Sequence, residues 1–440
     1  SIIYIKTKNI MKSFNLTLMI VCLISFLPSE IFAQDINISG EIRPRFEFRN
    51  GYKAPMPDGN DPASFISQRT RLNAFYGNTN FRSKLVLQDV RVWGDVPQLN
   101  KSDAYGTSLH EAWGEVIFSN KFSIKLGRQE IIYDDQRIFA SSNWAQQARS
   151  HDAAIIKYSP SSNHQFDLGL AYNANGESLY KVDYIVNNYK TFQYLHYHGN
   201  FDKIGLSFLA LNNGMAYTST TDSTQNIAYS QTIGPRLTFK GDEVMFNAAF
   251  YYQGGKNKFN NSLSAIYFSA NVSYALSSKF TLGLGGEYLS GTSSENQANA
   301  NENDKSFKPF YGANHKFNGW MDYFFVGSYM YSNGLLDIYL PLTLKVDKFT
   351  FKLIPHYFMA AATVAQQEED GTWKDFSSGL GAEIDFTASY TFNKNVVVSA
   401  GYSQMMANES MQVLKGGNHK NTNNWAWVMF TFKPTFFQSK

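Results

Sequence analysis

The chain has 440 residues and a formal net charge of +3, and only 17% of its residues are charged, whereas 36 Phe, 27 Tyr and 7 Trp give it a large aromatic share. Soluble domains average about 25% charged residues. So many aromatic side chains would collapse, which excludes a disordered chain. No apolar run of the roughly 20 residues that a helical span needs crosses the body of the chain. A large β protein remains, either soluble or embedded in a membrane.

The N-terminal region has the pattern of a secretory signal peptide. Met11 is followed by a lysine, an apolar stretch over residues 14–27 and a small residue, Ala33. This order of charged, apolar and small residues is typical of a cleaved leader. We therefore expect cleavage after Ala33 and place residues 1–10 upstream of the start methionine. Cys22, the only cysteine of the chain, lies inside this leader.

The mature chain is then predicted to be a single domain, residues 34–440, without cysteine and therefore without disulfide bonds. Such a secreted domain must be held by its backbone hydrogen bonds and its packing. Removal of the leader takes away three lysines and one glutamate and leaves 36 basic against 35 acidic residues. This near-neutral balance argues against a nucleic-acid partner.

Charged and apolar residues alternate along many segments of the mature chain. In residues 40–49 every odd position is charged, whereas Ile42 and Phe46 occupy even positions. A period of two places the charges on one face of a β-strand and the apolar groups on the other. The same alternation recurs over residues 232–240 and 380–389.

The predicted strands are long, and their length separates two kinds of β protein. Strands of soluble sandwiches average roughly 5 to 6 residues, whereas strands that cross a membrane need roughly 9 to 11. Eighteen long segments are predicted: 37–49, 66–77, 80–91, 108–119, 121–131, 151–159, 164–174, 189–200, 202–213, 228–240, 243–254, 264–276, 279–291, 335–346, 348–362, 378–392, 395–407 and 424–434.

Short connections alternate with long ones, and short turns on one rim with long loops on the other are typical of an outer-membrane barrel. Residues 320–331 also look strand-like, but a nineteenth strand would break the alternation, so 292–334 is assigned to one extracellular loop. The sequence therefore predicts an all-β fold, an antiparallel transmembrane β-barrel of 18 strands with short periplasmic turns and long extracellular loops. A barrel of this size, in the outer membrane of a Gram-negative bacterium, leaves an aqueous lumen.

Arginine is concentrated in the first third of the chain, where ten of the eleven residues lie. Neighbouring strands are about 5 Å apart, so the lumenal face would gather these cations into one patch. Guanidinium groups pair with carboxylates and stack on flat faces, which suits an acidic sugar or another organic anion. Alternatively, nearby glutamates pair with the cations and brace the wall. The cations are Arg43, Arg45, Arg49, Arg69, Arg71, Lys84 and Lys125, and the glutamates are Glu41, Glu47, Glu111 and Glu115.

Two segments fit the alternation less well. Arg128 shares its parity with lipid-facing residues, so it must lie at the rim, beyond a bulge or at the start of a loop. In the third strand, Asp89 and Arg91 share the parity of Leu85 and Leu87, which leaves the register there open.

Signals for catalysis and for metal binding are weak. The chain has no nucleophile elbow, no zinc-protease helix and no phosphate-binding loop. His196 and His198 share one strand face, which allows a paired metal site, but a histidine pair without metal is the better interpretation. We therefore expect no metal, no cofactor and no enzymatic activity.

Several short motifs occur in a fixed order along the mature chain. They are Gln68-Arg69-Thr70-Arg71; Leu126-Gly127-Arg128-Gln129; Tyr133-Asp134-Asp135-Gln136-Arg137 with Trp144, Arg149 and Asp152; and Phe310-Tyr311-Gly312, Asn314-His315, Phe317, Gly319 and Asp322, followed by Gly334-Leu335, Asp337 and His356. Their order and spacing resemble the alginate-export outer-membrane porin family. The resemblance implies an eighteen-stranded monomeric barrel with a basic constriction that passes an anionic polysaccharide, mapped here onto Arg43, Arg45, Arg69, Arg71, Arg128 and Arg137.

The sequence as a whole predicts a passive outer-membrane channel for an anionic polysaccharide or a small anionic or sugar-like solute. The expected partners are outer-membrane lipids and lipopolysaccharide together with that solute. Loops as long as 292–334 are usually functional or disordered, and its aromatic strip makes it a candidate for an inward-folded constriction. Alternatives are a surface-binding or structural barrel closed by its loops and, third, a lipid-modifying barrel enzyme. Selectivity is assigned to Arg43, Arg45, Arg69, Arg71, Lys84, Arg128, Arg137, Glu41, Glu111 and Glu115, and the constriction to Tyr311, His315, Trp320 and Asp322.

Overall fold

The computed structural model describes residues 34–99, 106–186, 188–299, 303–313, 315–325 and 332–439, and the predicted leader lies outside them. Within these residues the chain forms one closed antiparallel barrel of eighteen strands, which confirms the predicted fold. Two strands are interrupted, so twenty elements build the barrel. They are β1 (Asp35–Asn50), β2 (Ala63–Gly77), β3 (Phe81–Val92), β4 (Ser108–Ser119), β5 (Phe122–Gln129), β6 (His151–Ser161), β7 (His164–Tyr172), β8 (Thr191–Phe201), β9 (Ile204–Thr218), β10 (Gln225–Lys240), β11 (Val244–Lys256), β12 (Ser262–Ala275), β13 (Phe280–Leu289), β14 (Leu335–Tyr339), β15 (Leu342–Val346), β16 (Phe349–Met359), β19 (Gly379–Asn393), β20 (Val396–Ala407), β21 (Asn423–Phe432) and β22 (Thr435–Gln438).

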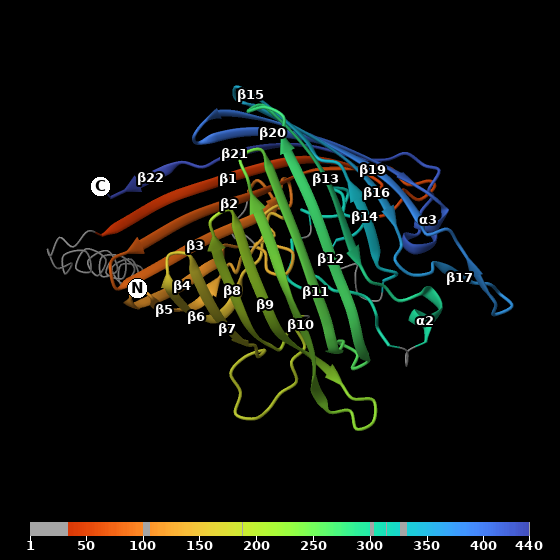
Figure 1. Ribbon diagram of the computed structural model, residues 1–440, viewed down its shortest axis with the longest axis horizontal. Coiled ribbons are helices and arrows are strands. Elements are labelled where there is room, and N and C mark those ends of the chain that lie inside the picture. The colour runs from red at the N-terminus through yellow and green to blue at the C-terminus, as the bar shows by residue number, and fades with distance from the viewer. Residues whose placement is uncertain are drawn as a thin grey trace, which may run out of the picture.

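The sheet closes because β1 pairs with β2 on one side and with β21 and β22 on the other. β1 begins and β22 ends at the same end of the barrel (Figure 1), and the connections at that end are short, such as 120–121 and 202–203. The opposite end carries the long loops, the helices α2 (Ser294–Ala298) and α3 (Glu409–Lys415), and the hairpin of β17 (Ala365–Gln367) and β18 (Trp373–Asp375). The predicted alternation of short and long connections is therefore confirmed. None of the described helices is both long and apolar enough to cross a bilayer.

The two faces of the wall differ as the alternation predicts. On β1, Ile42 and Phe46 are 44% and 42% exposed on the outside, whereas Arg43 and Arg45 between them are only 5% and 4% exposed. Apolar side chains cover the outer face of the other strands in the same way. In a bilayer this face meets lipid, and the closed hydrogen-bond ladder leaves no sheet edge unpaired.

Proline explains the two interrupted strands. The predicted strand 335–346 is divided into β14 and β15 because Pro341 has no N–H to donate to the ladder. Its carbonyl still accepts a hydrogen bond from the Gly283 amide at 2.8 Å. Pro434 separates β21 from β22 in the same manner, and its carbonyl accepts from the Gly40 amide at 2.9 Å.

The structure explains the charged residues at the C-terminal end of the third strand. Asp89 and Arg91 lie on the same face of β3 as the exposed Leu85, and they form an ion pair with a shortest distance of 2.6 Å. The pair belongs to the end of β3 that leads into the long loop, where water is near. Asp89 and Arg91 are therefore tolerated on the outer face of the strand, because they lie at the rim and neutralise each other.

Two segments from the long-loop end fold into the lumen. Loop A, residues 130–150, joins β5 to β6, and loop B, residues 303–313 and 315–325, belongs to the connection between β13 and β14. Phe139 of loop A and Tyr311 of loop B form a bridge and pack with Phe192 and Tyr194 of β8. The inward fold expected for 292–334 is thus observed in its described part. The sequence predicts loop A only as an extracellular loop, and that prediction was incomplete.

Gly234 provides a test of the wall itself. A Cβ at this position would lie 1.8 Å from the Phe250 carbonyl oxygen across the β10–β11 ladder. Since the obstacle is backbone, Gly234→Ala should prevent correct pairing of the two strands. We expect loss of the heat-modifiable folded band in gel electrophoresis of outer membranes. Gly176→Ala, where a Cβ would meet no atom within 4 Å, serves as the control and should fold normally.

Candidate functional site

The first two strands build a wall of buried arginines that faces the lumen. Arg43 of β1 lies directly opposite Arg69 of β2 in the ladder. Arg69 is fully buried, and Arg43 and Arg45 are almost so. Uncompensated charges would be very costly at such depth, so each guanidinium must find acceptors.

Carboxylates of the same wall supply part of these acceptors. Arg69 donates to Glu41, and Glu47 accepts from both Arg45 and Arg49 at 2.9 and 2.8 Å. The predicted bracing by Glu41 and Glu47 is therefore present in the structure. Two carboxylates cannot neutralise four arginines, however, and the remaining donors turn elsewhere.

Loop A supplies the other acceptors. Arg43 Nη1 donates to the Asn143 carbonyl at 2.8 Å and Arg45 Nη1 to the Trp144 carbonyl at 2.8 Å. The Gln146 side chain accepts from Arg43 Nε at 3.1 Å. Amide and carbonyl oxygens satisfy the guanidinium donors without carrying a net charge. The wall therefore keeps an excess of positive charge although its arginines are hydrogen-bonded.

The motif at residues 133–137 fixes loop A to the rest of the barrel. Asp134 and Gln136 have φ values of 51° and 71°, in the left-handed region, so successive side chains point to different strands. Burial, the largest single influence, would raise the pKa of Asp134, but its interactions with His196, Ser207 and Arg236 together outweigh burial and hold the pKa below its ordinary value. The contacts, in order around the barrel, are Tyr133 with Asp167 of β7, Asp134 with His196 of β8 and Ser207 of β9, Asp135 with Arg236 of β10, and Arg137 with Glu287 of β13.

Loop B attaches to an acidic sector of the wall formed by β13, β14 and β19. The backbone amides of Trp320 and Met321 donate to Asp385 at 3.1 Å and to Glu383 at 2.8 Å. The Asn318 amide group donates to Glu287 at 3.0 Å and to Asp337 at 3.2 Å. Carboxylates need donors, and this loop presents N–H groups to them, which is the reverse of the arrangement on the arginine wall.

The two loops meet inside the lumen. The Ala140 amide donates to the Tyr311 carbonyl at 2.9 Å, and the Ala313 amide donates to the Gln136 carbonyl at the same distance. Burial raises the pKa of Tyr311 well above its ordinary value, so its hydroxyl stays neutral and donates to Asn213. The loops together fill part of the lumen with hydrogen-bonded backbone.

Aromatic rings form a second junction between the loops. Trp144 of loop A and His315 of loop B are stacked with ring centroids 4.2 Å apart. His315 lies 3.0 Å from Asp322, which also accepts a hydrogen bond from Tyr52. Trp425 of β21 packs edge-on against both rings of the stack. Three of the predicted constriction residues, His315, Trp320 and Asp322, therefore lie close to this junction.

The remaining predicted selectivity residues occupy different places. Arg71 faces the lumen and donates to Gln88 at 2.7 Å. Lys84 and Glu111 pair with each other on β3 and β4, and Glu115 accepts from Lys157 at 3.0 Å. These positions keep the predicted lumenal parity.

Arg128 and Arg137 do not join the arginine wall. Arg128 lies on the same face of β5 as the exposed Leu126, near the rim, and pairs with Asp152 at 2.8 Å. Arg137 belongs to loop A and reaches Glu287 of the acidic sector at 2.8 Å. The position of Arg128 outside the lumen was indicated by its parity in the strand. The position of Arg137 could not be predicted, because loop residues have no regular alternation.

The two histidines of the predicted pair have different partners, one in loop A and one in the barrel wall. His196 contacts Asp134 of loop A, and His198 lies 2.9 Å from the Ser207 hydroxyl. Across the described residues, no group of three or more His, Cys, Asp or Glu side chains is arranged to hold a metal ion.

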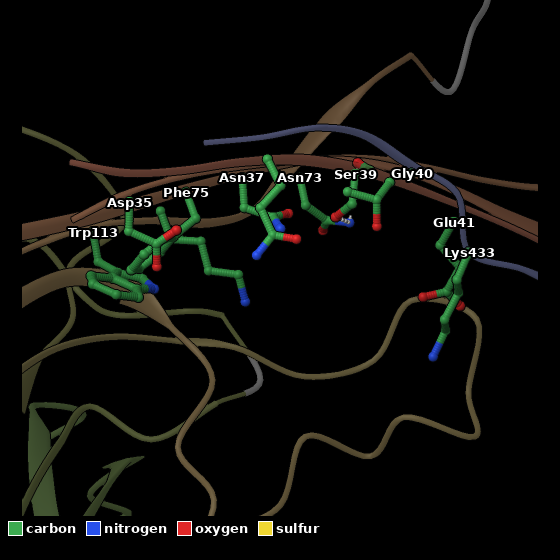
Figure 2. A pocket seen from close by; sticks show the side chains of 12 residues that line it. Asp35, Asn37, Ser39, Gly40, Glu41, Asn73, Phe75, Trp113 and Lys433 are labelled. Carbon is green, nitrogen blue, oxygen red and sulfur yellow. Dashed lines mark hydrogen bonds between the residues drawn. The ribbon is translucent and has the colours of Figure 1, made fainter. Parts of the chain in front are cut away.

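A cavity of about 720 Å³ is lined by residues from the end of the barrel where β1 begins and β22 ends. Figure 2 shows the side chains that line it. Its lining comes from β1 to β4 and from the last strand. Asn37, Asn73, Phe75 and Trp113 are among the lining side chains. Sequence reasoning placed Lys84 and Glu41 of this lining in the functional site but missed its amides and aromatic rings.

A closed barrel with an apolar outer face, a polar lumen and short turns at one end is a porin-like protein of the outer membrane of a Gram-negative bacterium. The chain belongs to the Alginate export family, whose model matches residues 34–423. Family and fold together identify an outer-membrane channel and confirm the resemblance inferred from the motifs. Such a barrel fits an association with membrane lipids and the passage of solutes.

Solved structures share the fold at low sequence identity. OccK9 (OpdG) of Pseudomonas aeruginosa is similar with a TM-score of 0.59 and 11% identity, over 91% of this chain and 98% of that one. OccAB4 of Acinetobacter baumannii gives a TM-score of 0.57 and 12% identity, over 93% of this chain and 100% of that one. OpdO of Pseudomonas aeruginosa gives a TM-score of 0.59 and 12% identity, over 92% of this chain and 98% of that one. A search of curated proteins finds no match.

The arginine wall yields a test of stability. Arg69→Met leaves Glu41 buried without its main partner and should lower the free energy of unfolding by about 3–5 kcal/mol. Adding Glu41→Gln should recover part of the loss, because no orphaned charge remains. Arg128→Met, which breaks an exposed pair, should cost less than about 1 kcal/mol. Urea unfolding of the barrel in detergent micelles, followed by tryptophan fluorescence, measures all three. Equal losses for Arg69→Met and Arg128→Met would contradict the assignment of the buried wall.

Proposed function

We propose that the protein passes anionic polysaccharide, or other anionic or sugar-like solutes, through the outer membrane along its arginine-lined lumen. The mature protein would be one barrel domain, residues 34–440, released from a signal peptide. It would act as a monomer that contacts lipopolysaccharide at the outer leaflet.

The observation that carries this proposal is the charge imbalance of the wall. The lumenal face of β1 and β2 carries five arginines and three carboxylates, which are Arg43, Arg45, Arg49, Arg69 and Arg71 with Asp35, Glu41 and Glu47. Glu130 of loop A adds an ion pair with Arg71 at 3.9 Å, so the wall still has more arginines than carboxylates. The other hydrogen-bond acceptors of the wall are neutral groups of loop A and the Gln88 amide. Low-dielectric walls focus such a field into the water beside them and raise the local concentration of anions.

A second candidate, a surface-binding or structural barrel with a closed lumen, is favoured by one observation. Loops A and B are hydrogen-bonded to each other and to the wall, so they obstruct part of the passage. Loop movement would then be required before a polymer passes. Conductance separates the two candidates, because a lumen sealed by its loops carries no ions.

Planar-bilayer recording of the purified protein tests the channel. We expect steady conductance with a reversal potential that favours anions under a salt gradient. The double substitution Arg49→Gln/Arg71→Gln removes two positive charges whose loss leaves the Arg69–Glu41 and Arg45–Glu47 pairs intact, and it should shift the reversal potential toward cation selectivity. Arg128→Gln, on the outer face, is the matched control and should leave the potential unchanged.

Two results would count against the proposal. An absence of conductance would exclude the channel and favour the closed barrel. Conductance with the same reversal potential in wild type and Arg49→Gln/Arg71→Gln would mean that these arginines only brace the wall. Salt dependence provides a further check, since the selectivity should weaken as the Debye length falls from about 10 Å at 0.1 M to about 3 Å at 1 M.

A further inference from the structure

The cavity at the end where β1 begins and β22 ends has the dimensions of a binding site. Its volume of 720 Å³ lies within the roughly 300–1,000 Å³ of typical ligand pockets. Asp35 and Gln438, at the outer limits of the first and last strands, contribute to its lining together with Glu41 further along β1. In Figure 2, Trp113, Phe75, Asn37, Asn73 and Lys433 are arranged along an elongated space. Such a shape suits a linear ligand better than a compact one.

The lining combines aromatic rings with side-chain amides. Phe75 and Trp113 provide flat apolar faces, and Asn37, Asn73 and Gln438 provide groups that both donate and accept hydrogen bonds. This pairing matches the chemistry of a pyranose ring, whose C–H groups form an apolar face and whose hydroxyls need both donors and acceptors. Phosphate or a simple carboxylate would use the amides and leave the rings unoccupied.

The Trp113 ring is held in position before any ligand arrives. Its indole Nε1 donates to Glu111 at 3.0 Å. The Lys125 ammonium lies 4.0 Å from the ring centroid, on a residue that is not part of the cavity lining. One face of the indole is therefore occupied by a cation, which leaves the other face for a ligand. A preorganised ring loses little freedom on binding.

Several polar side chains of the cavity have few or weak protein partners. Within the described part of the chain, the Asn37 side-chain amide makes no hydrogen bond, and the Lys433 ammonium makes no hydrogen bond or ion pair, although its charge acts on Glu41. Asn73 makes only long contacts of 3.4 Å to Ser39. These groups are free to bind a ligand, whereas the arginines deeper in the lumen are already bound to loop A.

The charges of the lining nearly cancel. Lys84 and Lys433 are balanced by Asp35 and Glu41, and Lys84 is also paired with Glu111. Recognition at this place therefore depends on stacking and on amide hydrogen bonds, and little on the charge of the ligand. In this respect the cavity differs from the arginine wall that adjoins it at Arg43.

We infer that this cavity is a docking groove for a linear saccharide at the periplasmic mouth of the barrel, formed by Asn37, Asn73, Phe75, Trp113 and Lys433, and that it accepts neutral and uronic-acid sugars alike. The inference rests on the proposed function in that the docked saccharide is the solute to be passed. It extends that function by separating two steps. The groove binds the sugar rings, and the arginine wall beyond it discriminates by charge.

Binding to the purified mature protein in detergent micelles tests the groove without requiring conduction. Isothermal titration uses two probes, a tetrasaccharide of uronic acids and maltotetraose. We expect both to bind with dissociation constants within about threefold of each other, and a change from about 50 to about 500 mM salt to alter either by less than about threefold. Asn37→Ala/Asn73→Ala should weaken both probes about tenfold or more.

The control is Asn271→Ala, which removes a lumenal asparagine of β12 outside the cavity and should leave both affinities unchanged. Trp113→Phe, which keeps an aromatic face, should weaken binding less than Trp113→Ala. Should Trp113→Ala fail to fold, the asparagine variant still decides the question.

The outcomes separate the groove from the channel. If neither probe binds wild type, or if Asn37→Ala/Asn73→Ala binds both as wild type does, the groove is excluded even when the same preparation conducts ions. If the uronic-acid probe binds more than tenfold tighter than maltotetraose and is released by salt, the arginine wall holds the ligand and the inference is wrong. Binding of both probes by a protein that conducts no ions would support the groove and exclude the channel.

Discussion

A barrel of eighteen strands encloses more space than its own inward side chains can fill, and every polar group buried in that space needs a partner. This constraint determines the interior of the molecule. Loops A and B enter the lumen and supply hydrogen-bond partners that the wall cannot supply to itself. The spacing of the motif at 133–137 follows from it, because consecutive side chains must reach strands from β7 round to β13. The fold and the inserted loops are therefore parts of one arrangement and not a scaffold with separate additions.

Opposite charges on two sectors of the wall decide how each loop is held. The guanidinium groups of Arg43 and Arg45 take carbonyl oxygens of loop A, whereas Glu383 and Asp385 take backbone amides of loop B. In both cases neutral dipoles supply part of the hydrogen bonding that the buried groups need. The acidic sector is also paired with basic side chains, because Arg137 contacts Glu287 at 2.8 Å and His356 lies 2.9 Å from Asp337 and 3.7 Å from Asp385. Full neutralisation by side chains would hold the loops equally well but would remove the field from the lumen. The structure thus combines a tightly packed interior with an arginine wall that contains more arginines than carboxylates.

The sequence predicted the strands of the barrel wall well, but it predicted the loops and the cavity inside the barrel poorly. The difference has a physical reason. The alternation in residues 40–49 identifies strand, face and lumenal charge together, because a two-residue period is imposed by the pleat. Loop A has no such period, so the partners of Asp135 and Arg137 could not be read from spacing. The parity of Arg128 correctly indicated that this residue does not face the lumen. The amides and rings around Trp113 carried no signal either, because polar and aromatic residues are ordinary on a lumenal face and only their convergence from five strands marks a site.

The contacts between the two loops are unequal, and this affects where the lumen can widen. Near Tyr311 the loops share backbone hydrogen bonds inside an aromatic core, and separating them there would leave buried amides unpaired at about 1–3 kcal/mol each. At Trp144 and His315 the contact is a stack of two rings, and such a pair contributes about 0.5–1.5 kcal/mol beyond its buried area. When the two rings separate, Trp144 retains its cation–π contact with Arg45, and His315 retains its hydrogen bond with Asp322. Of these two contacts, the ring stack in front of β21 therefore costs less to separate. It also adjoins the arginine wall, so a passage opened there would expose its positive field to the solute.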